Sequence, residues 1–268
     1  MEKNDHKNSS NRSLVPGERR RRIAELIRVS GSVTVAELEE GFGISPMTAR
    51  RDLAALEEEG RVQRTHGGAV LPEFAGHEDS FGQRLEEHES AKDRLARAAV
   101  SLLERGEAIF VDSSTTAYYA ARRIMEEGLR ATLLTNLVPA MSLLADRESP
   151  NIELVGLGGV LRPLTKSYVG PHTTRMIRNH FADKAFFSVK GVTSNGYLTD
   201  PDPLEAEVKR MMVERSEEPI LLIDASKFEQ RGLHVITHVS KLARVLVSDA
   251  TAEQIEGLVE MGAVVERV

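Results

Sequence analysis

The chain has 268 residues, of which 41% are hydrophobic and 28% are charged, with no cysteine and a formal net charge of −6. This composition is typical of a globular protein, and it excludes disulfides, thiol nucleophiles and the cysteine-ligated zinc of zinc-finger DNA binding. No run of about 18 apolar residues is present to cross a bilayer. The opening stretch MEKNDHKNSSNRSLVPG lacks the apolar segment of a secretory signal. We therefore expect a disordered tail over residues 1–17 and a cytoplasmic location.

The net charge is unevenly distributed along the chain. Residues 1–72 carry 12 Lys and Arg against 11 Asp and Glu, whereas the remainder carries 23 against 30. Basic side chains gather in two groups within the first part, Arg19–Arg22 and then Arg50, Arg51, Arg61, Arg64 and His66. A basic run is more often a solvated helix face than a DNA contact, so nucleic-acid binding has to be argued from how these residues are presented.

Start and stop signals predict three short helices in the first part. The first covers about 18–30, where apolar residues recur at helical spacing. Thr34 and Glu37 stand at the spacing of a capping box, so a second helix begins there. Ser45 can cap a third, with proline at its first position and Gly60 as its stop. Three helices in so short a segment predict a compact bundle.

The third helix has an apolar face and a basic face. At 100° per residue, Ala49, Leu53 and Leu56 form one stripe, while Arg51 falls roughly opposite and Arg50 lies on a flank. Glu57, Glu58 and Glu59 come later in this helix, so only its N-terminal half can approach a polyanion. That polarity suits a recognition helix that enters the major groove N-terminus first.

The segment RVQRTHGGAVL predicts a hairpin after this helix. Two short strands flank a Gly-Gly pair, which would tolerate positive φ in a turn. Arg64 and His66 lie near the expected tip, where they could contact a phosphate backbone or a minor groove. The competing interpretation is that the arginines of this part pair with Asp52 and Glu57 on a solvated bundle. The capped helices, the charge distribution and the hairpin together favour a winged helix-turn-helix that binds DNA.

Residues 18–72, especially ISPMTARRDLAALEEEGRVQRTHGGAV, resemble the N-terminal winged helix-turn-helix of the DeoR family of bacterial transcription regulators. The arginine pair before Asp-Leu and the R-x-H-G-G-A wing are the most specific marks of this resemblance. It implies DNA-facing roles for six residues: Ser45, Thr48, Arg50 and Arg51 on the helix, and Arg64 and His66 on the wing.

The remaining chain alternates between apolar runs and helical patterns. Residues 73–88 show no clean periodicity and are expected to be a linker, and 90–104 is a predicted helix. The predicted strands are EAIFVD, RATLLTN, NIELVGLGG, DKAFFSV, PILLID, RVLVSD and AVVERV. Strands that alternate with helices predict an α/β domain over 89–268 with a largely parallel sheet. Such sheets bind ligands beyond the carboxyl ends of their strands.

Polar and charged residues follow several of these strand ends. The first strand ends in DSSTT, where hydroxyls and free N–H groups at a helix start form either an anion site or an ordinary cap. The candidate ligand-binding residues are Asp112, Ser113, Ser114, Thr115, Thr116, Asn136, Gly158, Gly159, Lys190, Glu205, Lys209, Asp224 and Lys227. Asp112 would repel a phosphate, so we expect it to accept a hydrogen bond from a sugar hydroxyl.

The motifs DSSTT, LLTN, GLGG, DKAFFSVKGV, EAEVKRMM and LLIDASKF resemble the C-terminal effector domain of the same family over residues 80–268. The resemblance implies a fold like that of pentose-phosphate isomerases and coenzyme A transferases, and a phosphorylated sugar held by residues 113–116 with the later glycines and charges nearby. Two positions depart from the family pattern. Ser114 stands where glycine is usual, and Lys190 stands where small residues are common.

The sequence therefore predicts a two-domain regulator of transcription, most simply a repressor of carbohydrate-metabolism genes that a phosphorylated sugar releases. We expect it to bind double-stranded operator DNA as a homo-oligomer, a dimer or tetramer, and to have no membrane association, cofactor, metal site or catalytic activity. One alternative is a sugar-phosphate isomerase or CoA-transferase-like enzyme with an appended DNA-binding domain, in which Glu205 is the candidate base. Another is a sensor domain that serves oligomerisation alone.

Overall fold

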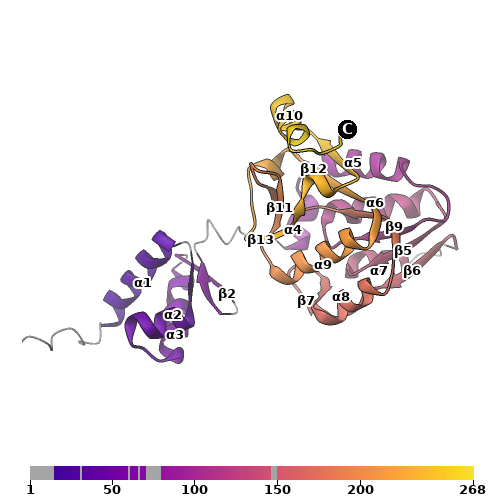
Figure 1. Ribbon diagram of the computed structural model, residues 1–268. Coiled ribbons are helices and arrows are strands. Elements are labelled where there is room, and N and C mark those ends of the chain that lie inside the picture. The colour runs from indigo at the N-terminus through magenta and orange to yellow at the C-terminus, as the bar shows by residue number, and fades with distance from the viewer. Residues whose placement is uncertain (1–14, 31, 60, 66, 71–79, 146–149) are drawn as a thin grey trace, which may run out of the picture. The chain divides into compact units, whose positions relative to one another are not determined.

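The structure is a computed structural model, which describes residues 15–30, 32–59, 61–65, 67–70, 80–145 and 150–268. The chain divides into two compact units, Met1–His77 and Glu78–Val268, whose elements are labelled in Figure 1. None of the helices within the described ranges is long and apolar enough to span a membrane. Most of the expected N-terminal tail, residues 1–14, lies outside the described residues, while Pro16 and Gly17 already belong to the first helix.

The first unit is a bundle of three helices with a small sheet. Its elements are α1 (Pro16–Ser30), β1 (Ser32–Thr34), α2 (Val35–Phe42), α3 (Pro46–Glu58), β2 (Gln63–Thr65) and β3 (Gly68–Val70). The three predicted helices and the hairpin are present, with limits that differ by a few residues. The strand β1 was not predicted. It pairs antiparallel with β3, and the sheet order is β1-β3-β2.

Side chains next to α2 and α3 in the sequence set the limits of these helices. The Thr34 hydroxyl accepts from the Glu37 backbone N–H and the Glu37 carboxylate accepts from the Thr34 N–H, which completes the predicted capping box. Helix α2 ends at Gly43, whose φ of +62° lies in the left-handed region. The Ser45 hydroxyl accepts from the Thr48 backbone N–H at 3.2 Å and caps α3.

One apolar core joins the helices to the sheet. Its buried side chains include Ile23, Ile27, Leu38, Ala49, Leu53, Leu56, Val62 and Ala69. The stripe predicted for α3 is therefore confirmed as its core face. The sheet explains Gly68, because a Cβ there would lie 1.9 Å from the carbonyl oxygen of Val33 on β1. Gly68 does not adopt a positive φ, so glycine is needed there for the close approach of β1 and not for a left-handed turn.

The second unit is built around a seven-stranded parallel sheet. In spatial order its strands are β15 (Val265–Arg267), β14 (Arg244–Ser248), β12 (Ser216–Asp224), β9 (Ala182–Phe187), β4 (Ala108–Val111), β5 (Ala131–Thr135) and β6 (Ile152–Gly156). Every neighbouring pair is parallel, which confirms the predicted sheet. The chain adds β5 and β6 on one side of β4 and then returns to β9 on the other. Open α/β sheets bind ligands at such a reversal.

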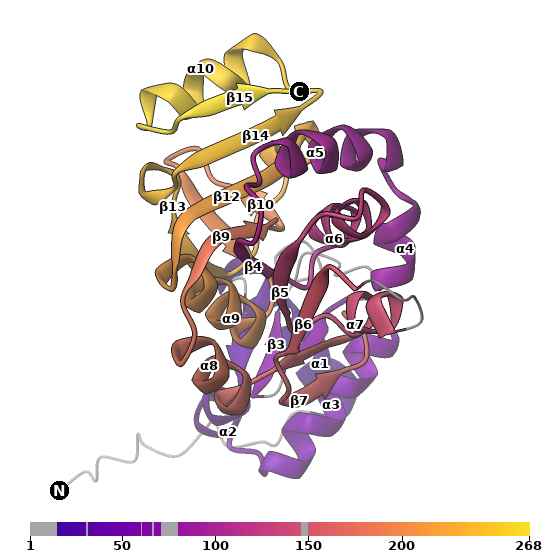
Figure 2. The ribbon, with the colours of Figure 1, turned by 90° about the vertical axis from the view of Figure 1, so that its right-hand side faces the viewer.

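Helices cover both faces of this sheet (Figure 2). One face carries α5 (Glu89–Ser101), α6 (Thr115–Glu126) and α7 (Val138–Ala145), and the other carries α8 (Pro171–Arg178) and α9 (Pro203–Glu214). Successive strand residues alternate between the two layers: Ile109 and Val111 pack with α5 to α7, and Phe110 packs with α8 and α9. Burial on both faces explains why these strands are almost continuously apolar. Helix α10 (Ala252–Glu260) precedes the edge strand β15.

Several short elements of this unit were not predicted. An antiparallel sheet consists of β10 (Gly191–Val192), β11 (Tyr197–Asp200) and β13 (His234–His238), and a separate hairpin consists of β7 (Val160–Arg162) and β8 (Ser167–Val169). Two 3-10 helices each directly follow a strand: η1 (Ala225–Phe228) follows β12, and η2 (Val239–Lys241) follows β13. Helix α8 was also not predicted.

Helix α4 (Phe81–Glu86) lies inside the segment 73–88 that we expected to be a linker. Ser80 and Gln83 form a capping box at its start. The Phe81 side chain is 2% exposed and meets the Tyr118 ring edge-on, with 5.7 Å between ring centroids. The expected linker is therefore wrong for residues 80–88, which belong to the second unit. Its earlier part, 73–79, lies outside the described residues.

Candidate functional site

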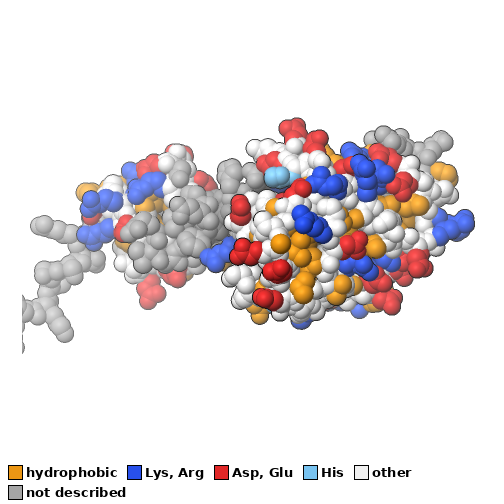
Figure 3. All heavy atoms as spheres, turned by 90° about the horizontal axis from the view of Figure 1, so that it is seen from above, with side chains coloured by type: hydrophobic (Ala, Val, Ile, Leu, Met, Phe, Trp, Pro, Cys, Tyr) orange, Lys and Arg blue, Asp and Glu red, His pale blue; other side chains and the backbone are white. Residues whose placement is uncertain are grey.

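Two arginines project into solvent from the first half of α3. Arg50 and Arg51 are both exposed, while Ala49 and Leu53 on the opposite face are buried in the core. Within the described part of the chain, neither guanidinium forms an ion pair. Figure 3 shows basic side chains on the surface of this unit, interspersed with acidic ones. The helix therefore presents two cationic groups that remain available to a polyanion.

The acidic residues near α3 pair with other arginines. The Asp52 carboxylate accepts from Arg19 Nε at 2.5 Å in a part-buried ion pair. The Glu57 carboxylate accepts from the Arg64 backbone N–H at 2.9 Å and lies 3.9 Å from the Arg64 guanidinium. Pairing with Asp52 and Glu57, the competing interpretation of the sequence, thus holds for Arg19 and Arg64.

The other candidate DNA-facing residues lie at the start of α3 and on the hairpin. The Ser45 hydroxyl, which caps the helix, also lies within hydrogen-bond distance of the Thr48 hydroxyl, at 2.9 Å. The Arg64 side chain is 42% exposed on β2. His66, the second predicted wing residue, lies outside the described residues.

In the second unit a pocket opens at the carboxyl ends of β4, β9 and β12. Seven of the candidate ligand residues line it: Ser114, Thr115, Thr116, Lys190, Lys209, Asp224 and Lys227. These residues come from three strand ends and from α6 and α9, so the topology brings together positions that are far apart in the sequence. The pocket stands where the strand order reverses, which is the place expected for a ligand.

The start of α6 combines a cap with free donors. The Ser114 hydroxyl accepts from the Ala117 backbone N–H at 3.1 Å, which is the ordinary cap. In the described residues no protein group accepts from the backbone N–H groups of Thr115 and Thr116. Unpaired N–H groups at a helix start favour an anion. The segment therefore forms the ordinary cap and also leaves two N–H donors that are available to an anion.

Two further lysines bring positive charge to the pocket. Lys92 of α5 is 4% exposed, and burial lowers its pKa to about 8, with a further lowering by Lys227. Burial also lowers the pKa of Lys227; Asp224 opposes this shift and Lys190 adds to it. Burial and the neighbouring cations therefore disfavour the protonated form of both side chains. An anion placed between them would offset that cost.

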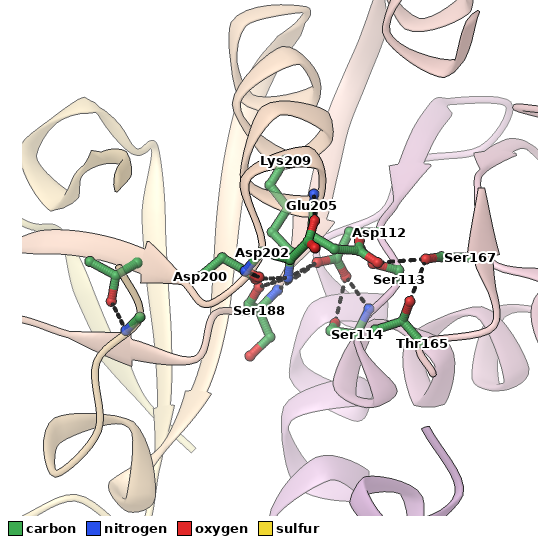
Figure 4. A network of polar contacts seen from close by, with 12 residues as sticks. Asp112, Ser113, Ser114, Thr165, Ser167, Ser188, Asp200, Asp202, Glu205 and Lys209 are labelled. Atoms are coloured by element: carbon green, nitrogen blue, oxygen red, sulfur yellow. Dashed lines mark hydrogen bonds and ion pairs between the residues drawn. The ribbon is translucent and has the colours of Figure 1, made fainter. Parts of the chain in front are cut away.

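A buried ionic network supports the floor of the pocket (Figure 4). Lys209 Nζ lies 3.0 Å from Asp112 Oδ2 and 3.2 Å from Asp200 Oδ2, and it donates to the Ser188 carbonyl at 2.7 Å. Burial alone would lower the pKa of Lys209, but the two carboxylates raise it well above its usual value. Asp112 is fully buried and also accepts from the Ser114 backbone N–H at 3.0 Å. Its oxygens are thus occupied by the protein, contrary to the expected sugar contact.

Glu205 is held in a second buried group beside this network. The hydroxyls of Ser113 and Ser167 each donate to one oxygen of its carboxylate at 2.6 Å, and Arg162 Nη1 lies 3.8 Å away. Figure 4 shows Ser113 turned toward Glu205. Neither Ser113 nor Glu205 lines the pocket, so the structure does not bring these two candidates to it.

Three other candidates are engaged by the chain itself. The Asn136 amide donates to the Tyr168 carbonyl at 2.9 Å, and the Thr173 hydroxyl donates to the Gly158 carbonyl at 3.0 Å. A Cβ on Gly159 would lie 2.1 Å from the Thr173 hydroxyl. Glycine is required there by the close approach of Thr173 on α8.

Sequence reasoning missed several lining residues: Arg84, Glu87 and His88 at the end of α4, Lys92 on α5, Ser188 after β9 and Asp200 of β11. A signal for Lys92 was present, because it falls on the apolar face of its helix beside Ala91 and Leu95, where a lysine is unusual. Ser188 is 3% exposed and its hydroxyl has no partner among the described residues. A buried hydroxyl of this kind indicates a missing polar partner.

Two family models match the chain. A DeoR-like helix-turn-helix domain matches residues 19–74, and a DeoR C terminal sensor domain matches residues 87–250. The first match contains α3 and its two exposed arginines. The second contains six of the seven strands of the parallel sheet, all but β15, and most of the pocket lining.

Whole-chain relatives agree with this division. The HTH-type transcriptional regulator GlpR of Haloferax volcanii is 32% identical and spans 90% of this chain and 92% of its own length. The L-fucose operon activator of Escherichia coli is 32% identical and spans 85% of this chain and 93% of its own length. The lactose phosphotransferase system repressor of Streptococcus mutans is 31% identical and spans 90% of this chain and 95% of its own length. A ribose 5-phosphate isomerase from Methanocaldococcus jannaschii aligns with a TM-score of 0.39 at 22% identity, over 53% of this chain and 55% of its own. The two family models and the whole-chain relatives show that the chain belongs to the DeoR family and is a DNA-binding transcriptional regulator.

Proposed function

We propose that this regulator represses carbohydrate-metabolism genes and releases its operator when a phosphorylated sugar occupies the pocket of the second unit. The observation that carries the sensing part is the local charge. The pocket is lined by five Lys and Arg side chains against three Asp and Glu, inside a part of the chain in which acids predominate. A local excess of positive charge in an otherwise acidic domain favours an anionic ligand.

A phosphate monoester fits this lining in charge and in hydrogen bonding. At neutral pH it carries close to two negative charges and presents acceptor oxygens only. The free N–H groups of Thr115 and Thr116 and the ammonium groups of Lys92 and Lys227 are donors. Asp224, which is 3% exposed and lines the same pocket, can accept from a hydroxyl. The combination suits a phosphorylated polyol better than an inorganic anion.

A thermal-shift comparison of the full chain tests this assignment. Phosphorylated pentoses and hexoses are expected to raise the melting temperature, because a ligand that binds the native state stabilises it, while the parent sugars leave it unchanged. Lys227→Met removes a pocket charge and should abolish the shift. Lys241→Met removes an exposed charge elsewhere and should retain it. Equal responses to phosphorylated and unphosphorylated sugars would contradict a phosphate site.

The DNA part of the proposal is supported by the exposed arginines of α3. Arg50→Ala and Arg51→Ala should each weaken binding to duplex DNA that the full chain has selected from a random pool, by about tenfold for a lost specific contact. Arg20→Ala is the matched control, because that arginine pairs with Glu59 at 3.5 Å. A gel-shift titration measures all three, and unchanged affinity of both α3 variants would remove α3 from the interface.

Repression, and not activation, is the sign we propose, although one relative is named an activator and another a repressor. A reporter fused to the promoter that the chain binds distinguishes the two, since deletion of the gene raises expression from a repressed promoter.

We also propose a dimer or tetramer, because a single small winged unit makes too few contacts for typical operator affinity. The enzyme alternative has less support, because Glu205 does not line the pocket.

A further inference from the structure

The end of α4 and the start of α5 form one wall of the pocket. Arg84 and Glu87, together with His88, line it from this segment, and Lys92 lines it one turn further on. Helix α4 also follows directly after residues 71–79, which connect the second unit to the first. The part of the sensor unit that is nearest in sequence to the DNA-binding unit is therefore also a part that meets the ligand.

Lys92 fastens the end of α4. Its ammonium group donates to the backbone carbonyls of Arg84, which is in the helix, and of Glu87, which immediately follows it. The Thr115 hydroxyl donates to the same Arg84 carbonyl at 3.4 Å. Between α4 and α5 the chain passes through His88 with a φ of +48°, a conformation that a residue other than glycine rarely adopts. This strained junction is thus held by contacts that start inside the pocket.

The two ends of α4 are attached by different forces. At its start, the Phe81 ring is buried against Tyr118, and the Phe81 backbone N–H donates to the Leu164 carbonyl at 2.8 Å. These contacts do not involve the pocket. At its end, attachment depends on the N–H donors of Lys92, whose protonated form burial and the neighbouring Lys227 disfavour. Only the second attachment can respond to an anion.

An ammonium group has three N–H donors, and two of those on Lys92 are used by the carbonyls of Arg84 and Glu87. One donor remains for a ligand in the pocket, so Lys92 can hold the ligand and the end of α4 together. An anion also relieves the repulsion between Lys92, Lys227 and Arg84 and so favours the protonated form that makes all three bonds.

We infer that a bound phosphate group tightens the segment 80–92 through Lys92, so that the ligand acts directly on the part of the sensor unit that follows the connecting residues. This inference rests on the proposed function of the pocket. In it, Lys92 is a ligand contact and also the positioning residue for α4. The signal to the DNA-binding unit then begins at α4 and does not have to pass through the parallel sheet.

Hydrogen exchange of the full chain, with and without saturating methyl phosphate, tests the inference. The expected result is slower exchange at two places, the first turn of α6 and the segment 80–92, by about tenfold for a charge-assisted hydrogen bond gained. In Lys92→Met the slowing at 80–92 should be lost while that at α6 remains. Lys92→Arg, which keeps the charge, should restore part of it. Lys166→Met is the control, because this exposed lysine lies 5.8 Å from the Phe81 ring, outside the pocket.

The outcomes separate the inference from the function on which it rests. Slower exchange at α6 with no change at 80–92 in the unmutated chain would overturn the inference and leave the phosphate site standing, and this arm needs no variant to fold. No change at either place would overturn both. Equal loss of slowing in Lys92→Met and Lys166→Met would show that general weakening of α4, and not the pocket charge, is responsible, which also overturns the inference.

Discussion

Two lysines of the pocket are equally buried but differ in what surrounds their ammonium groups. Lys92 and Lys209 are each 4% exposed. Burial alone would lower the pKa of Lys209, but the carboxylates of Asp112 and Asp200 outweigh it and raise that pKa. Lys92 donates to backbone carbonyls and lies near Lys227, and burial lowers its pKa to about 8. Lys209 therefore completes the fold, whereas Lys92 is left with an electrostatic cost that a ligand can remove.

Replacement of Lys209 should destabilise the second unit strongly. Lys209→Met leaves Asp112 and Asp200 buried without a counter-charge, and breaking a buried ion pair in this way costs about 3–5 kcal/mol. Lys227→Met removes an ammonium group that burial already disfavours, so its cost should stay below about 1 kcal/mol. Urea denaturation followed by circular dichroism measures both. Similar losses in the two variants would contradict the structural role of the Lys209 ion pairs.

Ligand affinity should depend on pH through Lys92, with a sign opposite to that of stability. The folded chain loses this proton near pH 8, whereas the unfolded chain keeps it up to the usual value of 10.5, so the Lys92 contribution to the unfolding free energy rises with pH across that window. Anion binding requires the proton, and affinity for methyl phosphate should fall as pH rises through 8. The probe stays dianionic there, since the second pKa of a phosphate ester is about 6.

Isothermal titration about one unit below and one unit above pH 8 checks this dependence. The groups that surround Lys92, namely Arg84, Glu87, Asp224 and Lys227, all influence its charge. Lys92→Met should therefore bind more weakly and show a flatter pH profile than the unmutated chain. An affinity that does not change across this range in the unmutated chain would show that Lys92 does not contact the anion.

At the scale of elements, the sequence was sufficient where the determining signals are local. The capping box of Thr34 and Glu37 and the cap of Ser45 predicted α2 and α3 because both partners lie within three residues. The parallel strands were predictable because burial on both faces makes them continuously apolar. Strand β1, the β7–β8 hairpin and the β10-β11-β13 sheet have two to five residues per strand and depend on partners distant in sequence, so no local pattern marks them.

The candidate site was predictable to the extent that its residues follow strand ends. Ser114, Lys190 and Lys227 line the pocket as the βα pattern indicated. Ser113 and Glu205 follow the same pattern but face each other across a buried hydrogen bond, because their direction depends on packing of α9 and not on position. Arg84 and its neighbours were missed because α4 precedes the first strand of the sheet. A strand-end rule cannot reach residues contributed by a helix of this kind.

The Ser45 cap allows a test of how far α3 depends on its first turn. Ser45→Ala removes the acceptor for the Thr48 backbone N–H and should lower the unfolding free energy of the first unit by about 1 kcal/mol. Ser45→Asp keeps an acceptor and should retain most of the stability. Thermal denaturation of the full chain, followed at a probe within the first unit, measures the difference. Equal melting temperatures of the unmutated chain, Ser45→Ala and Ser45→Asp would show that the cap does not contribute to stability.

At the scale of the whole molecule, charge is divided between the two parts of the chain. Residues 1–72 carry slightly more basic than acidic side chains, whereas the remainder carries 23 Lys and Arg against 30 Asp and Glu. The second part therefore repels a polyanion overall but gathers cations in its pocket. Such a division is consistent with DNA binding at α3 and with the small anionic ligand that we propose for the pocket.

The salt dependence of DNA binding follows from this division. Each phosphate neutralised by Lys or Arg contributes about −0.9 to the slope of the logarithm of affinity against the logarithm of salt concentration. Arg50→Ala and Arg51→Ala should each make that slope shallower by about one unit if the side chain contacts a phosphate. A variant that loses affinity with an unchanged slope would instead contact a base edge. Lys227→Met should leave the slope unaltered, because its charge lines the pocket of the second unit. Fluorescence anisotropy at several salt concentrations measures all slopes, and a shallower slope in Lys227→Met would contradict the separation of the two anion sites.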